Sequence, residues 1–270
     1  MTRIEKFGWK DSSLEGVGRV VSAHGDYYHL VSNDQEGEIL ARKKKSNFLS
    51  PIALKPITGD FVKFRYNSCG ESMILETLPR FSWFERKDPA ARRKSQTLAV
   101  NFDTLFVMMS VNENFSLPRL RRYHALAEDM GKAELVTILT KSDLDGSSAR
   151  LDETRQAFPD SRVLLISSLT GDGIDALDEF LRPTKTVAFI GSSGVGKSTL
   201  LNTLAGEQWA ATQEIQEWNG KGRHTTTSRE LVMLPSGAMV VDTPGIREIG
   251  MVGEEDAYIV KGESSHRWRK

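Results

Sequence analysis

The sequence predicts a small all-β domain followed by a larger α/β domain. The first 80 residues hold about five short β-rich runs close together. Beyond residue 100, fully apolar runs of five or six residues alternate with segments of helical periodicity, as in a parallel sheet covered by helices. A length of 270 residues also suits two domains of ordinary size. We expect the domains over 1–80 and 81–250, with a tail over 251–270.

The β-rich runs of the first domain predict a small barrel. They lie at 18–23, 27–32, 38–42, 61–66 and 72–77. Five antiparallel strands within about 65 residues fit a barrel of the OB type, and such barrels bind nucleic acid on a basic, aromatic face. Both ingredients are present in Arg42, Lys43, Lys44 and Lys45 and in Tyr27, Tyr28, Phe64 and Tyr66. The aromatic residues could equally fill the core, because alternate residues of a strand point inward.

Composition and charge exclude several classes of protein. Apolar residues make up 39% of the chain and charged residues 27%, which is usual for soluble globular proteins. No apolar run reaches the roughly 18 residues that cross a bilayer, and the N-terminus lacks an apolar signal region. We therefore expect a cytoplasmic protein with no membrane partner. The first 100 residues hold 17 Lys and Arg against 12 Asp and Glu, which favours an anionic partner for the N-terminal part.

The α/β part is expected to begin after a connection over 79–100. An apolar strand is predicted over 104–109, followed by a helix that Ser116 caps and Gly131 ends. Further helices are expected near 149–158 and 174–181. His124, on the first of these helices, is expected to be a packing or surface residue rather than a ligand.

A phosphate-binding loop is the strongest motif of the chain. The motif has the spacing Gly, any four residues, Gly-Lys-Ser, and it occupies residues 191–198. An apolar run over 186–190 precedes it, and a helix is predicted over 198–204. Backbone N–H groups of such a loop surround the α- and β-phosphates at the positive end of the helix, while Lys197 reaches the β/γ oxygens and Ser198 offers its hydroxyl to Mg²⁺. The residues expected to bind phosphate are Gly191, Ser192, Ser193, Gly194, Val195, Gly196, Lys197, Ser198 and Thr199.

Two further segments resemble the base-recognition motifs of GTPases. The strand predicted over 134–139 is followed by Thr140, Lys141, Ser142 and Asp143, in the pattern Asn/Thr-Lys-x-Asp. The Asp carboxylate accepts paired hydrogen bonds from guanine N1–H and the 2-amino group, which adenine does not offer. Thr140 replaces the usual Asn and is expected to lose one polar contact, worth about 1 kcal/mol. After a strand over 162–166, Ser167, Ser168 and Leu169 look like the loop whose backbone amide contacts guanine O6.

The expected switches follow the phosphate loop. Residues 220–227 are rich in Gly and hydroxyl side chains, and an apolar strand then delivers Asp242-Thr243-Pro244-Gly245. Asp242 is expected to hold Mg²⁺ through water, and the Gly245 amide to meet the γ-phosphate. Ile246 cannot orient the attacking water, so His224 is the residue proposed to position it, although it could instead anchor the switch or contact RNA. The expected catalytic residues are His224, Lys197, Thr225 and Thr226, and the expected Mg²⁺ ligands are Ser198, Thr226 and Asp242.

The order of these motifs predicts a circular permutation. The base-recognition motifs precede the phosphate loop, whereas ordinary GTPases run from the phosphate loop through the switches to the base motifs. A permutation of this kind is tolerated when the original termini lie close together. The predicted fold class is therefore an α/β P-loop GTPase domain, circularly permuted, preceded by an all-β OB-fold barrel.

This architecture resembles the RsgA family, GTPases that act in maturation of the small ribosomal subunit. The resemblance rests on Gly-Arg-His-Thr-Thr-Thr at 222–227 and Asp-Thr-Pro-Gly-Ile at 242–246, and covers about residues 17–250. Arg80, Gln96, Asn101 and Asp103 also fit the family's pattern. The resemblance implies a barrel that helps bind 16S rRNA, GTP hydrolysis stimulated by the 30S subunit, and release as the GDP form. We expect a monomer that does not bind DNA.

The end of the chain departs from that family, which normally closes with a zinc-binding domain of three Cys and one His. Cys69 is the sole cysteine, and His266 is the only Cys or His among residues 251–270, so zinc is not expected in this chain. Truncation, a frameshift or a vector-derived tail would each explain the difference. Two other functions stay open: a nucleotide-gated binding module that hydrolyses GTP negligibly without a partner, and an ATP-dependent enzyme sharing only the phosphate loop, which the motifs at Asp143 and Asp242 disfavour.

Overall fold

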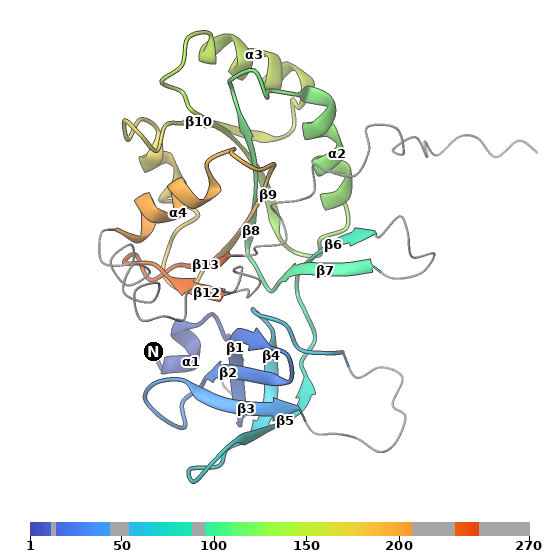
Figure 1. The fold of residues 1–270 in the computed structure, drawn as a ribbon, viewed down its shortest axis with the longest axis vertical. Helices are drawn as coiled ribbons and strands as arrows, with labels where there is room; N and C mark the ends of the chain where they lie inside the picture. The colour runs from blue at the N-terminus through green and yellow to red at the C-terminus, as the bar shows by residue number, and fades with distance from the viewer. Residues whose placement is uncertain (12–14, 44–53, 88–94, 207–229, 243–270) are drawn as a thin grey trace, which may run out of the picture.

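The computed structural model describes residues 1–11, 15–43, 54–87, 95–206 and 230–242, and it places a β-barrel beside an α/β domain (Figure 1). The predicted site residues His224, Thr225, Thr226 and Gly245 lie outside the described residues.

The barrel has the five strands that the sequence predicts. They are β1 (Val17–His24), β2 (Tyr27–Val31), β3 (Ile39–Lys43), β4 (Phe61–Arg65) and β5 (Ser72–Thr77). Their order is β1-β2-β3-β5-β4, and β4 pairs back onto β1, which closes the barrel. The pairing of β3 with β5 is parallel, so the expectation of five antiparallel strands is wrong for this pair. The interior is filled by Val20, Tyr28, Leu30, Ile39, Ala41, Val62, Phe64 and Ile74. A short helix, α1 (Arg3–Lys6), precedes the barrel and buries Ile4.

The α/β domain is built on a mostly parallel sheet in the order β10-β9-β8-β11-β13-β12. Pairing is parallel from β10 to β13, and β12 runs antiparallel beside β13. The strands are β8 (Thr104–Ser110), β9 (Glu134–Thr140), β10 (Arg162–Ile166), β11 (Thr186–Ile190), β12 (Glu230–Met233) and β13 (Met239–Asp242). The helices are α2 (Leu117–Ala127), α3 (Ser147–Ala157), the 3-10 helix η1 (Ile174–Leu177) and α4 (Lys197–Ala205).

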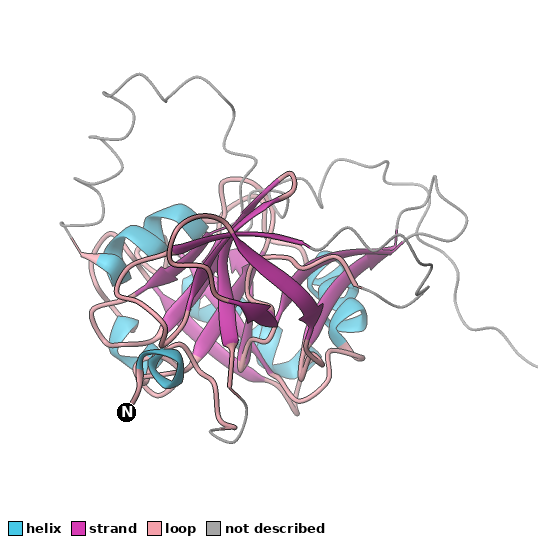
Figure 2. Cartoon of the chain, turned by 90° about the horizontal axis from the view of Figure 1, so that it is seen from below, coloured by secondary structure: helices cyan, strands magenta, loops and turns pink. Residues whose placement is uncertain are grey.

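Helices cover both faces of this sheet. Strand β8 is buried throughout, and its alternate residues face two different hydrophobic clusters. Leu105, Val107 and Met109 pack in the cluster that contains α2, while Phe106 and Met108 pack in the cluster that contains α4. Figure 2 shows strands through the middle of the molecule with helices beside them. None of the described helices is long and apolar enough to cross a membrane.

Three expectations about local structure need correction. Residues expected to form a connection instead contain two antiparallel strands, β6 (Trp83–Lys87) and β7 (Ser95–Val100), between which the Thr97 hydroxyl donates to Glu85 (2.8 Å). The segment 174–181 forms only the one-turn 3-10 helix η1, in which the Asp178 amide donates to the Asp175 carbonyl oxygen three residues back (3.1 Å). Strand β12 was not expected at all, as four residues show no clear period.

Candidate nucleotide site

The predicted motifs meet at one edge of the parallel sheet. Strand β9 ends at Thr140, β10 at Ile166, β11 at Ile190 and β13 at Asp242, and these strands run parallel. Their carboxyl ends therefore lie at the same edge, which is where open α/β sheets bind ligands. The base-recognition segment, the loop after β10 and the phosphate loop are brought together there, although 50 or more residues separate the first from the last.

The phosphate loop depends on its glycines. A Cβ atom on Gly191 would lie 2.6 Å from the Met108 carbonyl oxygen, so only glycine fits against the neighbouring strand. Gly194 (φ 74°) and Gly196 (φ 100°) adopt conformations that favour glycine. Val195 is 1% exposed and fixes the loop to the cluster under α4. Helix α4 then begins at Lys197 with Gly196 as N-cap, which offers no side-chain cap to the first amides.

The Lys197 ammonium lies inside the curve of this loop. Its Nζ donates to the carbonyl oxygens of Gly191 (2.6 Å) and Ser192 (2.7 Å). Ser193, Gly194, Ser198 and Thr199 are exposed around it, so the loop presents backbone and hydroxyl groups to solvent. A nucleotide phosphate at this position would offer the ammonium a charged acceptor, and charge-assisted hydrogen bonds are the stronger ones.

Thr140 connects the base-recognition segment to the phosphate loop. Its hydroxyl donates to the Val195 carbonyl oxygen at 2.7 Å, and the side chain is 3% exposed. Thr140 therefore makes one polar contact with the phosphate loop in this structure. The contact holds the two halves of the nucleotide site in register with each other.

Asp143 is oriented by the loop after β10. The Ser167 hydroxyl donates to Asp143 Oδ1 (2.5 Å) and accepts from the amides of Leu169 and Thr170 (3.2 Å each). Ser167 is buried and Asp143 is exposed, so one side of the carboxylate is bonded to Ser167 and the remainder is accessible to solvent. Lys141 has φ 67°, a left-handed conformation uncommon outside glycine, which turns the chain directly after β9.

The neighbourhood of Asp143 contains residues that the motifs did not identify. The Ser142 amide donates to the Ile166 carbonyl oxygen (3.0 Å), which joins the base-recognition segment to the end of β10. The Ser167 amide donates to the Asp172 carbonyl oxygen (2.9 Å), and the Thr170 hydroxyl donates to the Asp172 carboxylate (2.6 Å). The turn-rich run Thr-Gly-Asp-Gly at 170–173 was the available sign that this loop folds onto itself. Leu169 is 83% exposed at its tip.

The remaining predicted residues are described only in part. Asp242 ends β13, where its backbone pairs with Glu230. Within the described ranges, no three His, Cys, Asp or Glu side chains gather in a group that could hold a metal ion.

Comparisons with known proteins agree with this geometry. The family model described as RsgA GTPase matches residues 77–252. The chain is 38% identical over 261 residues to small ribosomal subunit biogenesis GTPase RsgA 1 of Listeria innocua, covering 92% of this chain and 72% of the relative. It is 42% identical over 206 residues to small ribosomal subunit biogenesis GTPase RsgA of Methanosarcina acetivorans, covering 76% of this chain and 56% of the relative.

Two crystal structures share the fold. YjeQ from Thermotoga maritima superposes with a TM-score of 0.64 at 26% identity, covering 87% of this chain and 76% of that one. YloQ, a circularly permuted GTPase, superposes with a TM-score of 0.54 at 22% identity, covering 87% and 74%. The predicted fold class, a permuted GTPase domain after a barrel, is confirmed. The chain therefore belongs to the RsgA GTPase family and is a GTP-hydrolysing enzyme.

Proposed function

We propose that this GTPase acts in biogenesis of the small ribosomal subunit, where it hydrolyses GTP to GDP and phosphate and is stimulated by the 30S particle. The observation that carries the enzymatic part is the Thr140 contact to Val195, because it joins a guanine-recognition segment to a phosphate loop in one site. The ribosomal part is supported by the relatives, which are named small ribosomal subunit biogenesis GTPases.

Guanine selectivity is assigned to Asp143. The exposed carboxylate accepts from guanine N1–H and the 2-amino group, while Ser167 restrains it from the opposite side. The stem of Lys141 covers the purine ring, and a backbone amide of the Ser168–169 turn meets O6. Adenine does not offer this pair of donors, so the Asp143 carboxylate would lack its partners with ATP, and the site is expected to discriminate against ATP.

Phosphate and Mg²⁺ binding are assigned to the phosphate loop and the end of β13. Loop amides, the start of α4 and Lys197 hold the phosphates. The donors proposed for Mg²⁺ are the hydroxyls of Ser198 and Thr226 and the Asp242 carboxylate, and oxygen donors are the ligands this ion prefers. The pairing of Ala188 with Val241 brings the end of β13 beside the phosphate-loop strand, which supports this set. Bound Mg²⁺ neutralises charge on the β- and γ-phosphate oxygens.

Water activation is assigned to His224, with Thr225 or Thr226 closing over Mg²⁺ and the Gly245 amide meeting the γ-phosphate. Ile246, the residue after Asp-x-x-Gly, has no polar atom in its side chain and cannot orient the nucleophile. Intrinsic hydrolysis is therefore expected to be slow until a partner completes the site.

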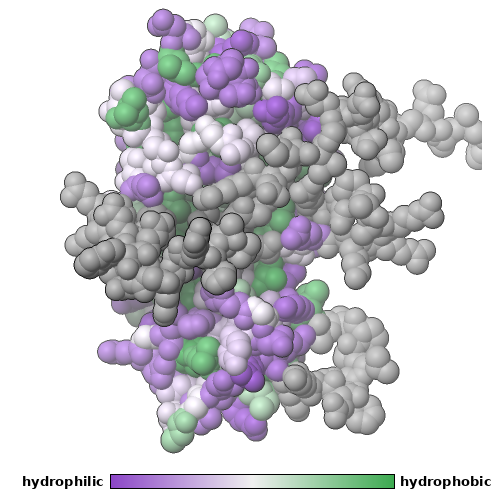
Figure 3. Space-filling view, viewed as in Figure 1, coloured by the Kyte–Doolittle hydropathy of each residue, from purple (hydrophilic) through white to green (hydrophobic). Residues whose placement is uncertain are grey.

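The barrel is the proposed contact with 16S rRNA. Tyr28 and Phe64 fill the barrel core, but Tyr27 is 39% exposed on its outer face. The Arg42 guanidinium lies 4.1 Å from the Tyr27 ring centroid, and Leu40 is exposed on the same strand as Arg42. Figure 3 shows this end of the molecule as mostly hydrophilic with scattered hydrophobic residues. An aromatic ring beside an arginine suits unpaired bases and phosphates, whereas duplex DNA is not a proposed partner.

The other expectations are kept as parts of this proposal. The domains are a barrel over 1–80 and a GTPase domain over 81–250, with a tail over 251–270. The protein works in the cytoplasm as a monomer, with Mg²⁺ as its metal.

Nucleotide selectivity tests the enzymatic part directly. Parent protein should bind and hydrolyse GTP in preference to ATP, and Asp143→Asn should lose GTP affinity and gain affinity for xanthosine triphosphate, because the amide donates to the xanthine 2-oxo group. Asp145→Asn, an exposed carboxylate two residues further on, serves as the control and should leave selectivity unchanged. Unaltered GTP selectivity in Asp143→Asn would contradict the assignment.

Turnover with and without purified 30S subunits tests the ribosomal part. We expect a large increase with subunits. A partner-activated enzyme and a nucleotide-gated binding module would both show little turnover without subunits. Turnover with saturating subunits therefore decides between them, because only the enzyme would be stimulated.

A further inference from the structure

Strand β1 belongs to the barrel and also extends the GTPase sheet. Its Ser22 pairs with Glu230 of β12, and Glu230 in turn pairs with Asp242 of β13. An 11-stranded sheet therefore runs from β10 through β12 and β1 to β4 (Figure 1). In the sequence, Glu230 follows the segment that holds Thr225 and Thr226, and Asp242 precedes Gly245. The barrel thus meets the GTPase domain at the strand residues nearest both predicted switches.

A β-bulge divides β1 between two hydrophobic cores. The register with β2 changes from Val20 opposite Leu30 to Ser22 opposite His29, so Val21 is an extra residue. Val20 is fully buried inside the barrel. Val21 is 6% exposed and belongs to the GTPase cluster that includes Leu231, Met239 and Val241, all on β12 and β13. Two adjacent valines of one strand therefore pack in different domains.

Arg19 holds the other end of β1 in place. Its guanidinium is 1% exposed and donates to the carbonyl oxygens of Phe7 (2.6 Å) and Asn101 (2.9 Å), with Met239 Sδ at 3.4 Å. The group also lies 4.8 Å from the Phe61 ring centroid. Burial lowers the pKa of Arg19 to about 10, although Asp103 and Asp60 oppose this shift. One buried side chain therefore contacts the N-terminal segment, the interdomain connection and the first residue of β13.

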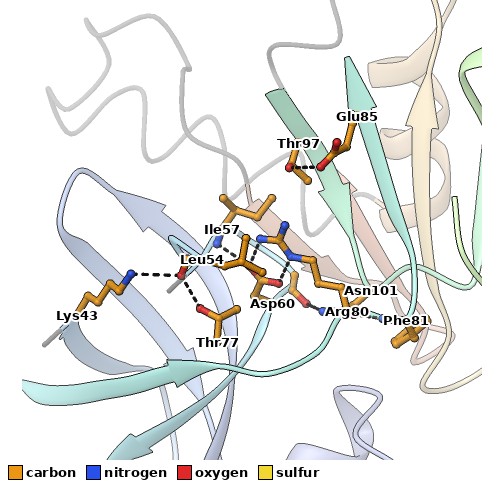
Figure 4. A network of polar contacts seen from close by, with 11 residues as sticks. Lys43, Leu54, Ile57, Asp60, Thr77, Arg80, Phe81, Glu85, Thr97 and Asn101 are labelled. Carbon is orange, nitrogen blue, oxygen red and sulfur yellow. Dashed lines mark hydrogen bonds and ion pairs between the residues drawn. The ribbon is translucent and has the colours of Figure 1, made fainter. Parts of the chain in front are cut away.

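The connection beside Arg19 is itself tightly held (Figure 4). Asn101 has φ 52°, accepts from the Phe81 amide (3.0 Å) and donates to the Gly59 carbonyl oxygen (3.2 Å). Arg80 forms a bidentate pair with the fully buried Asp60, with both contacts at 2.8 Å. A Cβ on Gly59 would lie 2.8 Å from the Val100 carbonyl oxygen, so barrel and connection approach closely. The boundary between the barrel and the connection is therefore closely packed and hydrogen-bonded.

We propose that β1 is the route by which a partner bound to the barrel and the nucleotide bound to the GTPase domain affect each other, with Arg19 and Val21 as positioning residues. A partner that shifts β1 changes the pairing of Ser22 with Glu230, and through it the position of Asp242. If the bound partner changes the nucleotide affinity of the GTPase domain by some factor, then by linkage the bound nucleotide changes the affinity of the barrel for its partner by that same factor. The identity of the partner, the 30S subunit, rests on the proposed function, whereas the route rests on the packing of β1.

Two adjacent valines provide a matched pair of variants. Val21→Ala removes two methyl groups from the side of β1 that faces the GTPase domain, and Val20→Ala removes the same atoms from the side that faces the barrel core. We expect Val21→Ala to lower the ratio of turnover with saturating 30S subunits to turnover without them by about 3- to 10-fold, with intrinsic turnover within about two-fold of the parent. Val20→Ala should lower the melting temperature but keep the ratio. An unchanged ratio in Val21→Ala, or an equal loss in both variants, would overturn the route.

A second measurement needs no ribosome. Amide hydrogen exchange over residues 17–24 should differ between the GDP-bound protein and the protein bound to a non-hydrolysable GTP analogue, and the difference should shrink in Val21→Ala but persist in Val20→Ala. Equal exchange with both nucleotides in the parent would overturn the proposal. If 30S subunits fail to stimulate the parent while exchange depends on the nucleotide, the ribosomal function fails and the coupling route stands.

Discussion

The two edges of the parallel sheet use polar groups in opposite ways. At the carboxyl edge, Thr140, Ser167 and Lys197 are restrained by hydrogen bonds to neutral backbone or to one exposed carboxylate, and the groups that would meet a nucleotide remain at the surface. At the amino edge, charged groups are paired with other groups of the chain. Asp103 accepts from the Lys185 ammonium (2.8 Å) and the Thr186 amide (3.0 Å). One edge is prepared for a ligand, and the other is completed by the chain itself.

The direction of the strands explains this difference. A parallel strand that ends at the carboxyl edge leads into a helix N-terminus, where backbone donors point outward and favour an anion. At the amino edge, the backbone groups of entering strands need partners from elsewhere, and the residues around Asn101 and Asp103 supply them. The barrel contacts that second edge through the buried Arg19, which donates to the Asn101 carbonyl oxygen, and through Gly59, which precedes the buried Asp60. We therefore expect variants at the amino edge to change stability and variants at the carboxyl edge to change nucleotide chemistry.

The largest effect is expected for Arg80→Met at the amino edge. The substitution leaves Asp60 fully buried without its bidentate partner, and breaking a buried pair in this way costs about 3–5 kcal/mol. Denaturant unfolding should show this loss, while GTP affinity of the folded protein should stay within about two-fold. Arg150→Met, which removes an exposed pair with Glu153, is the control and should cost less than about 1 kcal/mol.

The same variant carries a pH dependence with a defined sign. Burial raises the pKa of Asp60 above its ordinary value, although Arg80 and the Ile57 amide oppose the shift. Without Arg80 the carboxyl is expected to take up a proton more readily, which removes the unpaired charge. The folded state then binds more protons than the unfolded state, so stability falls as pH rises. The cost of Arg80→Met should therefore be smaller near pH 5 than near pH 8, and a cost independent of pH would argue that Asp60 finds another cationic partner.

Lys197→Ala tests the carboxyl edge. Turnover should fall by about 10²–10³-fold, because a preorganised donor to developing phosphate charge is lost. Lys185→Ala is the matched control, since Lys185 precedes β11 as Lys197 follows it and its ammonium pairs with Asp103. The control should keep turnover within about two-fold. Comparable turnover losses in the two variants would erase the distinction between the edges.

Thr140→Val gives a smaller effect at the same edge. The variant keeps shape but removes the donor to the Val195 carbonyl oxygen, a loss of about 1 kcal/mol that corresponds to about five-fold in nucleotide affinity. Thr137→Val lies on the same strand, β9, but its hydroxyl contacts His124 instead (2.8 Å), so nucleotide affinity should not change. Calorimetric titration with GDP compares the two. Equal affinities for both variants would mean that the Thr140 contact does not organise the phosphate loop.

The smallest effect concerns His124, which packs on a face of the sheet and belongs to neither edge. Its ring stacks on Phe158 with centroids 4.1 Å apart, and burial lowers its pKa. The unfolded chain then binds a proton below about pH 6.5 that the folded protein excludes, so stability is lost as pH falls through that range. Melting temperatures between pH 5.5 and 7.5 should show the loss, and His124→Gln should reduce it. Of the two roles expected for His124, these contacts confirm packing.

Local sequence was sufficient wherever a pattern is short and tied to one element. The strands over 72–77 and 162–166 were predicted residue for residue, and Ser116 caps α2 as expected by accepting from the Arg119 amide (3.3 Å). The pairing of β6 with β7 was missed because each strand holds only a short apolar run beside polar or charged residues, and only the cross-strand pairing shows that they are strands. For the nucleotide site, the motifs named the residues of the phosphate loop and base pocket, but no motif indicated that Ser167 orients Asp143.

The sequence by itself determined the chemistry, the order of the motifs and the permuted fold class, because each depends on residue types at fixed spacing along the chain. Only the tertiary structure decided that Thr140 bonds the phosphate loop, that Val20 and Val21 pack in different domains and that Arg19 is buried where the two domains meet. The physical reason is that the deciding contacts join residues far apart in the chain, such as Thr140 with Val195, 55 positions apart, and Arg19 with Met239, 220 positions apart. Their partners are set by how parallel strands and the barrel pack together, and no local period records that arrangement.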